Sequence, residues 1–227
     1  MSGILLDWEV QFWNTVAKSD GLNCPIYSRC QARVINGWCP TDEKKQINKL
    51  IDRNIFNQQE YDFIRSGEYG QVLQGIEQLA DEFLLEGDVY APPVPCSIIK
   101  KADEKKPIKV RYLPLKLVHG ALWDQHNEWV IHLKKDDPLN QKRYTLFHEV
   151  FHIMARNTMQ KGQRVRRKMR GGLFYELLAD HFATSVLMPV RWVTEKWDSL
   201  QDLDRLAHVF RVPKQVAFIR LRRLSLI

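Results

Sequence analysis

Apolar residues recur three or four positions apart in three segments of residues 1–87, which is the spacing of one face of an α-helix. The first segment begins near Leu5, and Thr41 stands where a residue that caps the second helix belongs. Gly87 marks the predicted end of the third segment, since glycine commonly follows the last turn of a helix. Its apolar stripe consists of Val72, Leu73, Ile76, Leu79, Ala80, Phe83 and Leu84. The pattern therefore predicts a helical N-terminal module.

The helical pattern stops at residues 88–95, where three prolines fall within positions 92–95. Proline has no backbone N–H and a fixed φ, so it interrupts a helix and favours an extended connector. We therefore predict a domain boundary here. Residues 1–87 form a helical module of unknown role, and residues 88–227 form a second domain.

Residues 108–113 and 128–133 are rich in β-branched and aromatic side chains, and a third candidate strand lies near 118–123. From Pro138 onward the apolar spacing is helical again, and a basic segment at 161–172 interrupts it. The last predicted helices form a tail at about 198–227. Strands grouped between helices predict an α+β protein with a small sheet.

The segment His148-Glu149-Val150-Phe151-His152 places two histidines four residues apart in an apolar stretch. Residues four apart lie on one face of a helix, so both imidazoles can bind one metal ion from successive turns. Glu149, beside the first histidine, can face a water molecule at the ion instead of binding the ion. The alternative is a pair of core histidines whose ring nitrogens are satisfied by the backbone.

A second helix supplies a third ligand. Zinc sites that act on substrates use three protein ligands and leave the fourth position open. Glu176 and Asp180 lie four residues apart in the largely apolar segment 173–189, and a buried carboxylate is unfavourable unless it is paired or binds a metal. We predict that Glu176 is the third ligand and that Asp180 accepts a ring N–H of a metal-binding histidine. The alternative is a Glu176 exposed to solvent.

Several motifs follow one another from about residue 90 to the end. They are PPVP at 92–95, WVIHL, RYTLFHE, HEVFH, E-x-x-A-D-x-F-A ending in LMP, and the closing segment LAHVFRVPKQVAFIRLRRLSLI. In this order they resemble the ImmA/IrrE family of metallo-endopeptidases, although Pro213 and Ser225 stand where the family pattern has Ser and Gly. The resemblance implies a zincin-like core, in which a small sheet packs on the HEVFH helix and the glutamate ligand comes from a following helix. It also implies a regulatory role, because family members cleave a helix-turn-helix transcriptional repressor, so the expected substrate is such a repressor or a similar regulatory protein.

The predicted chemistry is the hydrolysis of a peptide bond with Zn²⁺ as cofactor. Glu149 accepts a proton from the attacking water and delivers it to the leaving amine, while zinc polarises the scissile carbonyl. A donor for the developing oxyanion is also needed. Tyr144, Tyr175 and His181 lie near the motifs, and the sequence leaves the choice among them open. We expect the strand at 128–133 to pair with an extended substrate.

The net charge of +7 favours acidic partners. No run of about 18 apolar residues predicts a transmembrane helix. Asp7 and Glu9, in a start without basic residues, argue against a secretory signal. We therefore expect a cytoplasmic protein without membrane contact, whose thiols stay reduced.

Two segments have two interpretations each. Residues 161–170 hold six basic residues in ten and are either a solvated loop or an electrostatic guide for an acidic substrate or for DNA. Cys24, Cys30 and Cys39 are either free thiols or ligands of a second metal or cluster.

A rival function also follows from the sequence: a non-catalytic DNA- or protein-binding regulator whose metal site is structural or vestigial. Glu149 argues against this rival, because a purely structural site has no use for a general base. The histidines outside HEVFH are interpreted as ordinary surface or core residues.

Overall fold

The computed structural model describes residues 68–162 and 173–227. The predicted helices before residue 68, the thiols Cys24, Cys30 and Cys39, and most of the basic segment 161–170 lie outside the described residues. Their assignments stay predictions.

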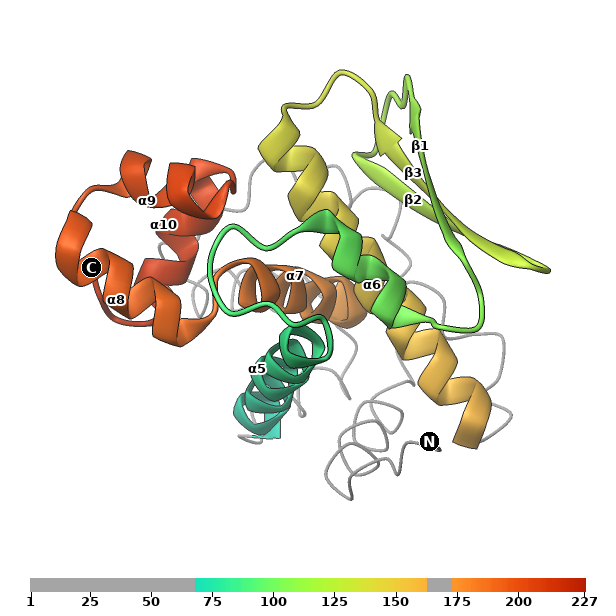
Figure 1. The fold of residues 1–227 in the computed structure, drawn as a ribbon, viewed down its shortest axis with the longest axis horizontal. Coiled ribbons are helices and arrows are strands. Elements are labelled where there is room, and N and C mark those ends of the chain that lie inside the picture. The colour runs from blue at the N-terminus through green and yellow to red at the C-terminus, as the bar shows by residue number, and fades with distance from the viewer. Residues whose placement is uncertain (1–67, 163–172) are drawn as a thin grey trace, which may run out of the picture.

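The described chain contains helices on both sides of a run of three strands (Figure 1). The elements are α5 (Glu68–Glu86), the 3₁₀ helix η2 (Cys96–Ala102), β1 (Ile108–Leu113), β2 (Gly120–Gln125), β3 (Glu128–Lys134), α6 (Leu139–Gly162), α7 (Leu173–Leu187), α8 (Val190–Leu200), α9 (Leu203–Phe210) and α10 (Lys214–Arg223). The predicted α+β class is confirmed, and all three predicted strands are present. None of the helices in the described ranges is long and apolar enough to cross a lipid bilayer.

The three strands form one sheet in the order β1-β3-β2. β3 pairs in parallel with β1 and antiparallel with β2, so hydrogen bonds occupy both of its edges. The expectation that the strand at 128–133 pairs with a substrate is therefore wrong, because a central strand has no free backbone N–H and C=O groups to offer. Among the described residues, the edge strands are β1 and β2.

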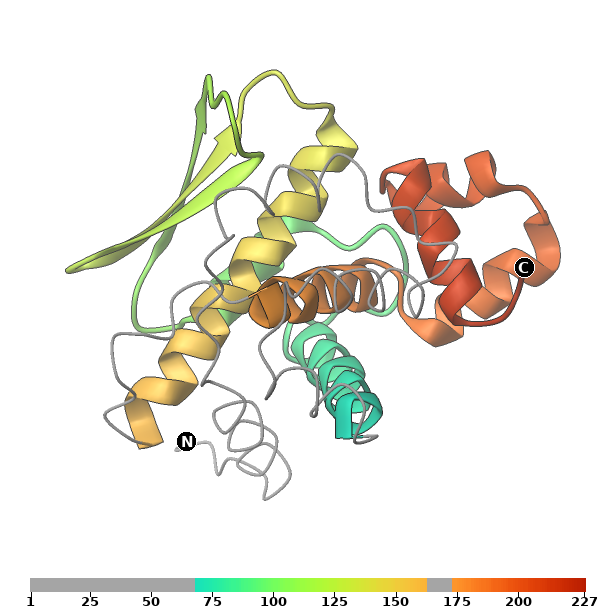
Figure 2. The same ribbon diagram turned by 180° about the vertical axis from the view of Figure 1, so that it is seen from behind.

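The sheet, α6, α7 and α5 follow one another as layers, with α8, α9 and α10 grouped beside them (Figures 1 and 2). One face of β3 supplies Trp129, Ile131 and Leu133 to the hydrophobic core under α6. The layers place α6, which carries HEVFH, between the sheet and the helix that carries Glu176. This is the arrangement of sheet and helices that the resemblance implied.

Helix α5 shares this core, although the predicted boundary assigned it to the N-terminal module. Its buried residues Val72, Ile76 and Phe83 belong to the same cluster as the apolar residues of α7. The rings of Phe83 and Phe182 meet edge to face, with centroids 5.8 Å apart. The core is thus continuous across residue 87, and the division into residues 1–87 and 88–227 stays a prediction.

A buried ion pair joins α5 to α10. Arg220 has an exposed fraction of only 1%, and its Nη1 and Nη2 donate to the two carboxylate oxygens of Glu77 at 2.5 and 2.8 Å. Its Nε donates to the carbonyl of Met188 at 2.8 Å. Burial by itself raises the pKa of Glu77, but hydrogen bonds from Arg220 and His181 hold it well below its ordinary value. Glu77 is therefore the counter-ion that allows a guanidinium to stay in the core.

We predict that Glu77→Gln lowers the free energy of unfolding by roughly 3 kcal/mol, because Arg220 keeps its buried charge without a counter-ion. Since the pKa of Glu77 is depressed in the folded protein, its contribution is complete above the ordinary value of 4.5 and is lost as the pH falls below it. Denaturant titrations at several pH values measure both effects.

Gln78→Ala is the matched control, because Gln78 is exposed on the same helix. This change should alter the free energy of unfolding by less than about 0.5 kcal/mol. Equal losses in the two variants, or a loss at Glu77 that does not shrink in acid, would contradict the role of the ion pair.

Candidate metal centre

The two HEVFH histidines and Glu176 come together between α6 and α7. His148 and His152 lie one helical turn apart on α6, and their Nε2 atoms are 3.2 Å apart. The Glu176 carboxylate of α7 reaches both rings, at 3.1 Å from His148 Nε2 and 3.5 Å from His152 Nε2. One ligand atom from each residue lies within 4.8 Å of the others. The three side chains that the sequence predicted as metal ligands thus lie together.

Asp180 holds the first of these histidines. Asp180 lies one turn beyond Glu176 on α7, and its Oδ1 is 2.8 Å from His148 Nδ1. An ionised Asp180 has no proton to donate, so Nδ1 of His148 is the donor in this hydrogen bond. In a neutral His148, Nε2 then carries the lone pair, which points toward His152 and Glu176. The Asp180 carbonyl also accepts hydrogen bonds from Tyr144 Oη at 3.2 Å and Thr184 Oγ1 at 2.8 Å. Asp180 therefore fixes both the ring and the local position of α7.

This set of atoms fits a divalent metal ion. Two imidazole nitrogens and a carboxylate oxygen converge with side-chain exposures of 14 to 18%, and such a set is typical of sites with an open fourth position. Burial lowers the pKa of His152 to about 4, so its ring is neutral and can act as a ligand. Burial also lowers the pKa of His148, but Asp180 and Glu176 together raise it well above its ordinary value. These two carboxylates thus favour positive charge at His148, whether Nε2 carries a proton or, on a neutral ring, binds a metal ion.

Glu149 lies beside this centre with an exposed fraction of 8%. Burial raises the pKa of its carboxyl group to about 7, which suits a group that exchanges a proton near neutral pH. The first residue of β2 lies directly against it. A Cβ atom on Gly120 would be 2.8 Å from Glu149 Oε1 and 2.4 Å from Thr145 Cγ2. Only glycine allows β2 to approach α6 this closely.

Two of the three candidate oxyanion donors are engaged elsewhere. Tyr144 uses its hydroxyl group on the Asp180 carbonyl. His181 is 4% exposed, accepts from Arg223 Nη1 at 3.0 Å through Nδ1, and has Nε2 3.2 Å from Glu77. Tyr175 is 7% exposed, and its ring lies 6.4 Å from that of Phe151. The structure therefore gives Tyr144 and His181 structural roles.

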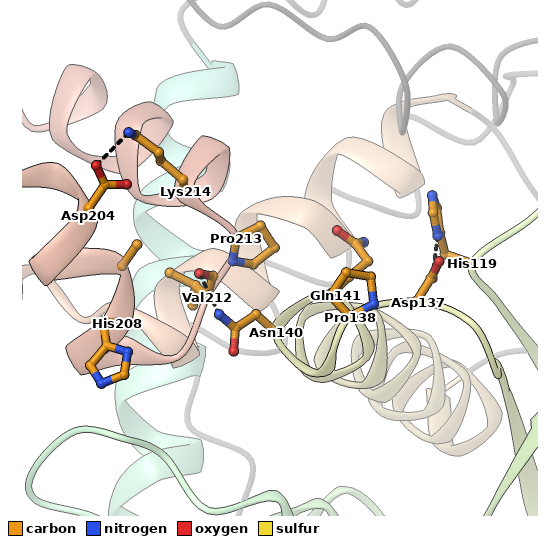
Figure 3. A pocket seen from close by; sticks show the side chains of 11 residues that line it. His119, Asp137, Pro138, Asn140, Gln141, Asp204, His208, Val212, Pro213 and Lys214 are labelled. Carbon is orange, nitrogen blue, oxygen red and sulfur yellow. Dashed lines mark hydrogen bonds and ion pairs between the residues drawn. The ribbon is translucent and has the colours of Figure 1, made fainter.

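A pocket of about 560 Å³ that no sequence pattern predicted lies between the start of α6 and the α9–α10 pair (Figure 3). At one end His119 is hydrogen bonded to Asp137, and at the other Lys214 is paired with Asp204 at 2.7 Å. His119 directly precedes Gly120, so the pocket begins one residue from the strand that covers Glu149. No periodicity signals this site, because its walls come from segments about 70 residues apart in the sequence.

Comparison with known proteins supports the resemblance. The family model described as IrrE N-terminal-like domain, a peptidase family, matches residues 103–222, which is more than half of the chain. A solved Mycobacterium tuberculosis transcriptional regulator is similar, with a TM-score of 0.52 and 15% identity over 65% of this chain. This chain spans only 46% of that regulator, and the likeness is one of fold. No curated protein matches. The chain belongs to the IrrE N-terminal-like family.

We predict that Gly120→Ala lowers the free energy of unfolding by roughly 1–3 kcal/mol, because the new methyl group overlaps the side chains of Thr145 and Glu149. Adding Thr145→Ser removes the closer of the two atoms and should recover part of the loss. A double-mutant cycle measured by urea denaturation isolates this coupling.

Gly70→Ala is the control for the change of residue type, because nothing lies within 4 Å of a Cβ at Gly70 of α5. This change should stabilise the protein by roughly 0.5–1 kcal/mol. If Gly120→Ala behaves like Gly70→Ala, the close approach of β2 to Glu149 is wrong.

Proposed function

We propose that this member of the IrrE N-terminal-like family is a zinc-dependent endopeptidase that cleaves a regulatory protein in the cytoplasm. One observation carries the proposal: the buried carboxyl group of Glu149 lies on the same helix as two imidazoles that meet Glu176 within 4.8 Å. A structural metal site has no use for this carboxyl group, whereas hydrolysis needs a base beside the metal.

In this proposal His148, His152 and Glu176 hold the zinc, and Asp180 orients His148 from behind. Two imidazoles and one carboxylate leave a coordination position for water or for the substrate carbonyl. When bound, zinc supplies Lewis acidity, which polarises the carbonyl and makes the attacking water more acidic. The hydrogen bond from His148 Nδ1 to Asp180 makes the imidazole a better electron donor toward the metal.

Glu149 moves the proton. One carboxylate oxygen takes a proton from the attacking water, and the same group later gives it to the leaving amine. A pKa of about 7 lets the carboxyl group do both near neutral pH. Gly120 and Thr145 confine the side chain, so its oxygens need little reordering as the reaction proceeds.

The strand order favours an extended peptide as substrate. β2 is an edge strand, and its first residue, Gly120, lies against Glu149. A peptide that adds to the edge of β2 that no described strand occupies places its backbone beside the base. In this proposal β2, and not the strand at 128–133, pairs with the extended substrate.

Two observations support a regulatory protein as substrate. The motifs resemble a family whose members cleave helix-turn-helix repressors, and the structural neighbour is a transcriptional regulator. That neighbour also supports a second candidate, a regulator that binds its partner without cutting it. The two functions differ in one requirement, because only the peptidase needs the proton transfer at Glu149.

We predict that Glu149→Gln lowers the rate of cleavage roughly 10²- to 10⁴-fold, because the amide cannot accept the proton of water. The metal content should stay at that of the wild type, since Glu149 is not a ligand. The assay incubates the zinc-loaded full chain with the repressor encoded nearest its gene, follows fragments by mass spectrometry and measures zinc by elemental analysis.

Glu195→Gln is the matched control, because Glu195 is an exposed carboxylate on α8 with a side-chain exposure of 62%. It should cleave at the wild-type rate. A Glu149→Gln protein that cleaves normally would remove the proposed base. A zinc-loaded wild type that binds the repressor without cutting it would favour the second candidate.

We predict that Glu176→Ala and Asp180→Asn differ in degree. Glu176→Ala removes a ligand and should abolish stoichiometric zinc binding. Asp180→Asn leaves the ligands in place and should weaken zinc binding roughly 10- to 100-fold, as changes to groups behind the ligands do. Competition with a chromophoric chelator measures both affinities, and full zinc occupancy in the Glu176→Ala protein would remove Glu176 from the ligand set.

A further inference from the structure

The sheet has a second face that the proposed peptidase does not use. Side chains alternate along a strand, so the neighbours of Trp129, Ile131 and Leu133 point away from α6. The strand register places these neighbours together with residues of β1 and β2, and Val130 among them is fully buried. We call this set the outer face: Lys109, Arg111, Leu113, Ala121, Trp123, Gln125, Glu128, Val130, His132 and Lys134. No helix or strand of the described residues lies over this face (Figures 1 and 2).

Two aromatic rings, those of Trp123 and His132, lie next to each other on the outer face. Trp123 is 56% exposed, whereas Trp129 on the opposite face of the same sheet is 1% exposed. The rings of Trp123 and His132 lie on neighbouring strands with centroids 6.1 Å apart. Partial burial, and then the charge of Arg111, lower the pKa of His132, so its ring is uncharged at neutral pH. An exposed indole beside a neutral imidazole offers a surface on which another flat ring can stack.

Cations surround these rings. Arg111 lies directly opposite His132 in the register of β1 and β3, and Lys134 is two residues further along β3. Lys109 is paired with Glu128. Neither Arg111 nor Lys134 has a carboxylate partner among the described residues. Among the described residues, the outer face thus has two cations without a carboxylate partner, one beside His132 on β1 and one beyond it on β3.

We propose that the outer face binds single-stranded nucleic acid, with a base stacked on Trp123 and phosphates bound by Arg111 and Lys134. Stacking on an exposed aromatic side chain needs an unpaired base, and the flanking cations match the phosphate backbone of the same strand. Duplex DNA hides the faces of its bases, and an acidic peptide satisfies the cations without requiring the indole. The binding is independent of the proposed peptidase function, since α6 lies on the other side of the sheet.

Fluorescence anisotropy with a labelled oligothymidylate of about 15 nucleotides tests the proposal on the full chain, because sites of this kind cover about 4–16 nucleotides. Trp123→Ala should weaken binding roughly 10-fold, and Trp123→Phe should retain part of the affinity. Arg111→Gln and Lys134→Gln should each lower the dependence of log K on log salt by about 0.7, which is the effect of losing one phosphate contact with a single strand.

Two control variants separate this face from the general charge of the protein. Tyr112→Ala removes an aromatic residue of β1 that is 58% exposed but points to the other face of the sheet. Lys196→Gln removes a cation from the surface of α8. Both should bind the oligonucleotide like the wild type, apart from a small uniform loss for the lysine variant.

Equal affinities for the wild type and Trp123→Ala, in proteins with equal melting temperatures, would overturn the proposal. So would tighter binding of the matching duplex, or competition by polyglutamate as strong as that by unlabelled oligothymidylate. Binding that is the same in the Glu149→Gln protein as in the wild type is the expected result, and it separates this proposal from the peptidase.

Discussion

Helix α7 is buried on nearly every side, and this constraint decides how the rest of the protein is arranged. Eleven consecutive residues, from Leu177 to Leu187, include only one that is not buried, Asp180. The polar groups of such a helix must find partners inside the protein, because water cannot reach them. Glu176 and Asp180 find theirs on α6, in the ring nitrogens of His148. His181 Nδ1 accepts from Arg223 of α10, and its Nε2 lies 3.2 Å from the carboxylate of Glu77 on α5.

This requirement explains why α5 packs against α7 and α10 although the family match begins at residue 103. His181 follows Asp180 directly, so the residue that orients a ligand and the residue that faces α5 are neighbours on one helix. Glu77 contacts His181 and Arg220 together, and Arg220 in turn binds the carbonyl of Met188 just after α7. Helix α7 therefore contacts α6 through Glu176 near its start and α10 through Met188 just after its end. These contacts hold the carboxylates of Glu176 and Asp180 in place beside His148.

The sequence predicted the parts of this arrangement that depend on short-range periodicity. The four-residue spacings of His148 with His152 and of Glu176 with Asp180 put each pair on one helix face, and tertiary packing only had to bring the two faces together. The partner of Glu77 lies 143 residues away, and no local pattern encodes that pairing. The expectation that the strand at 128–133 pairs with a substrate failed for the same reason. The composition of this segment predicts a strand, but it does not show that both edges of the strand are paired.

β2 links the two surfaces that carry the proposals. Gly120 points toward α6 and has no side chain, because any Cβ there would meet Glu149 and Thr145. Trp123, three residues along, points the other way and keeps a large ring in solvent. The two-residue period of a strand makes this division automatic, since odd and even positions cannot share a face. Under the two proposals, the edge of β2 that no described strand occupies pairs with a peptide backbone beside Glu149, while the outward side chains of β2 meet a different partner. Neither contact requires the other to form.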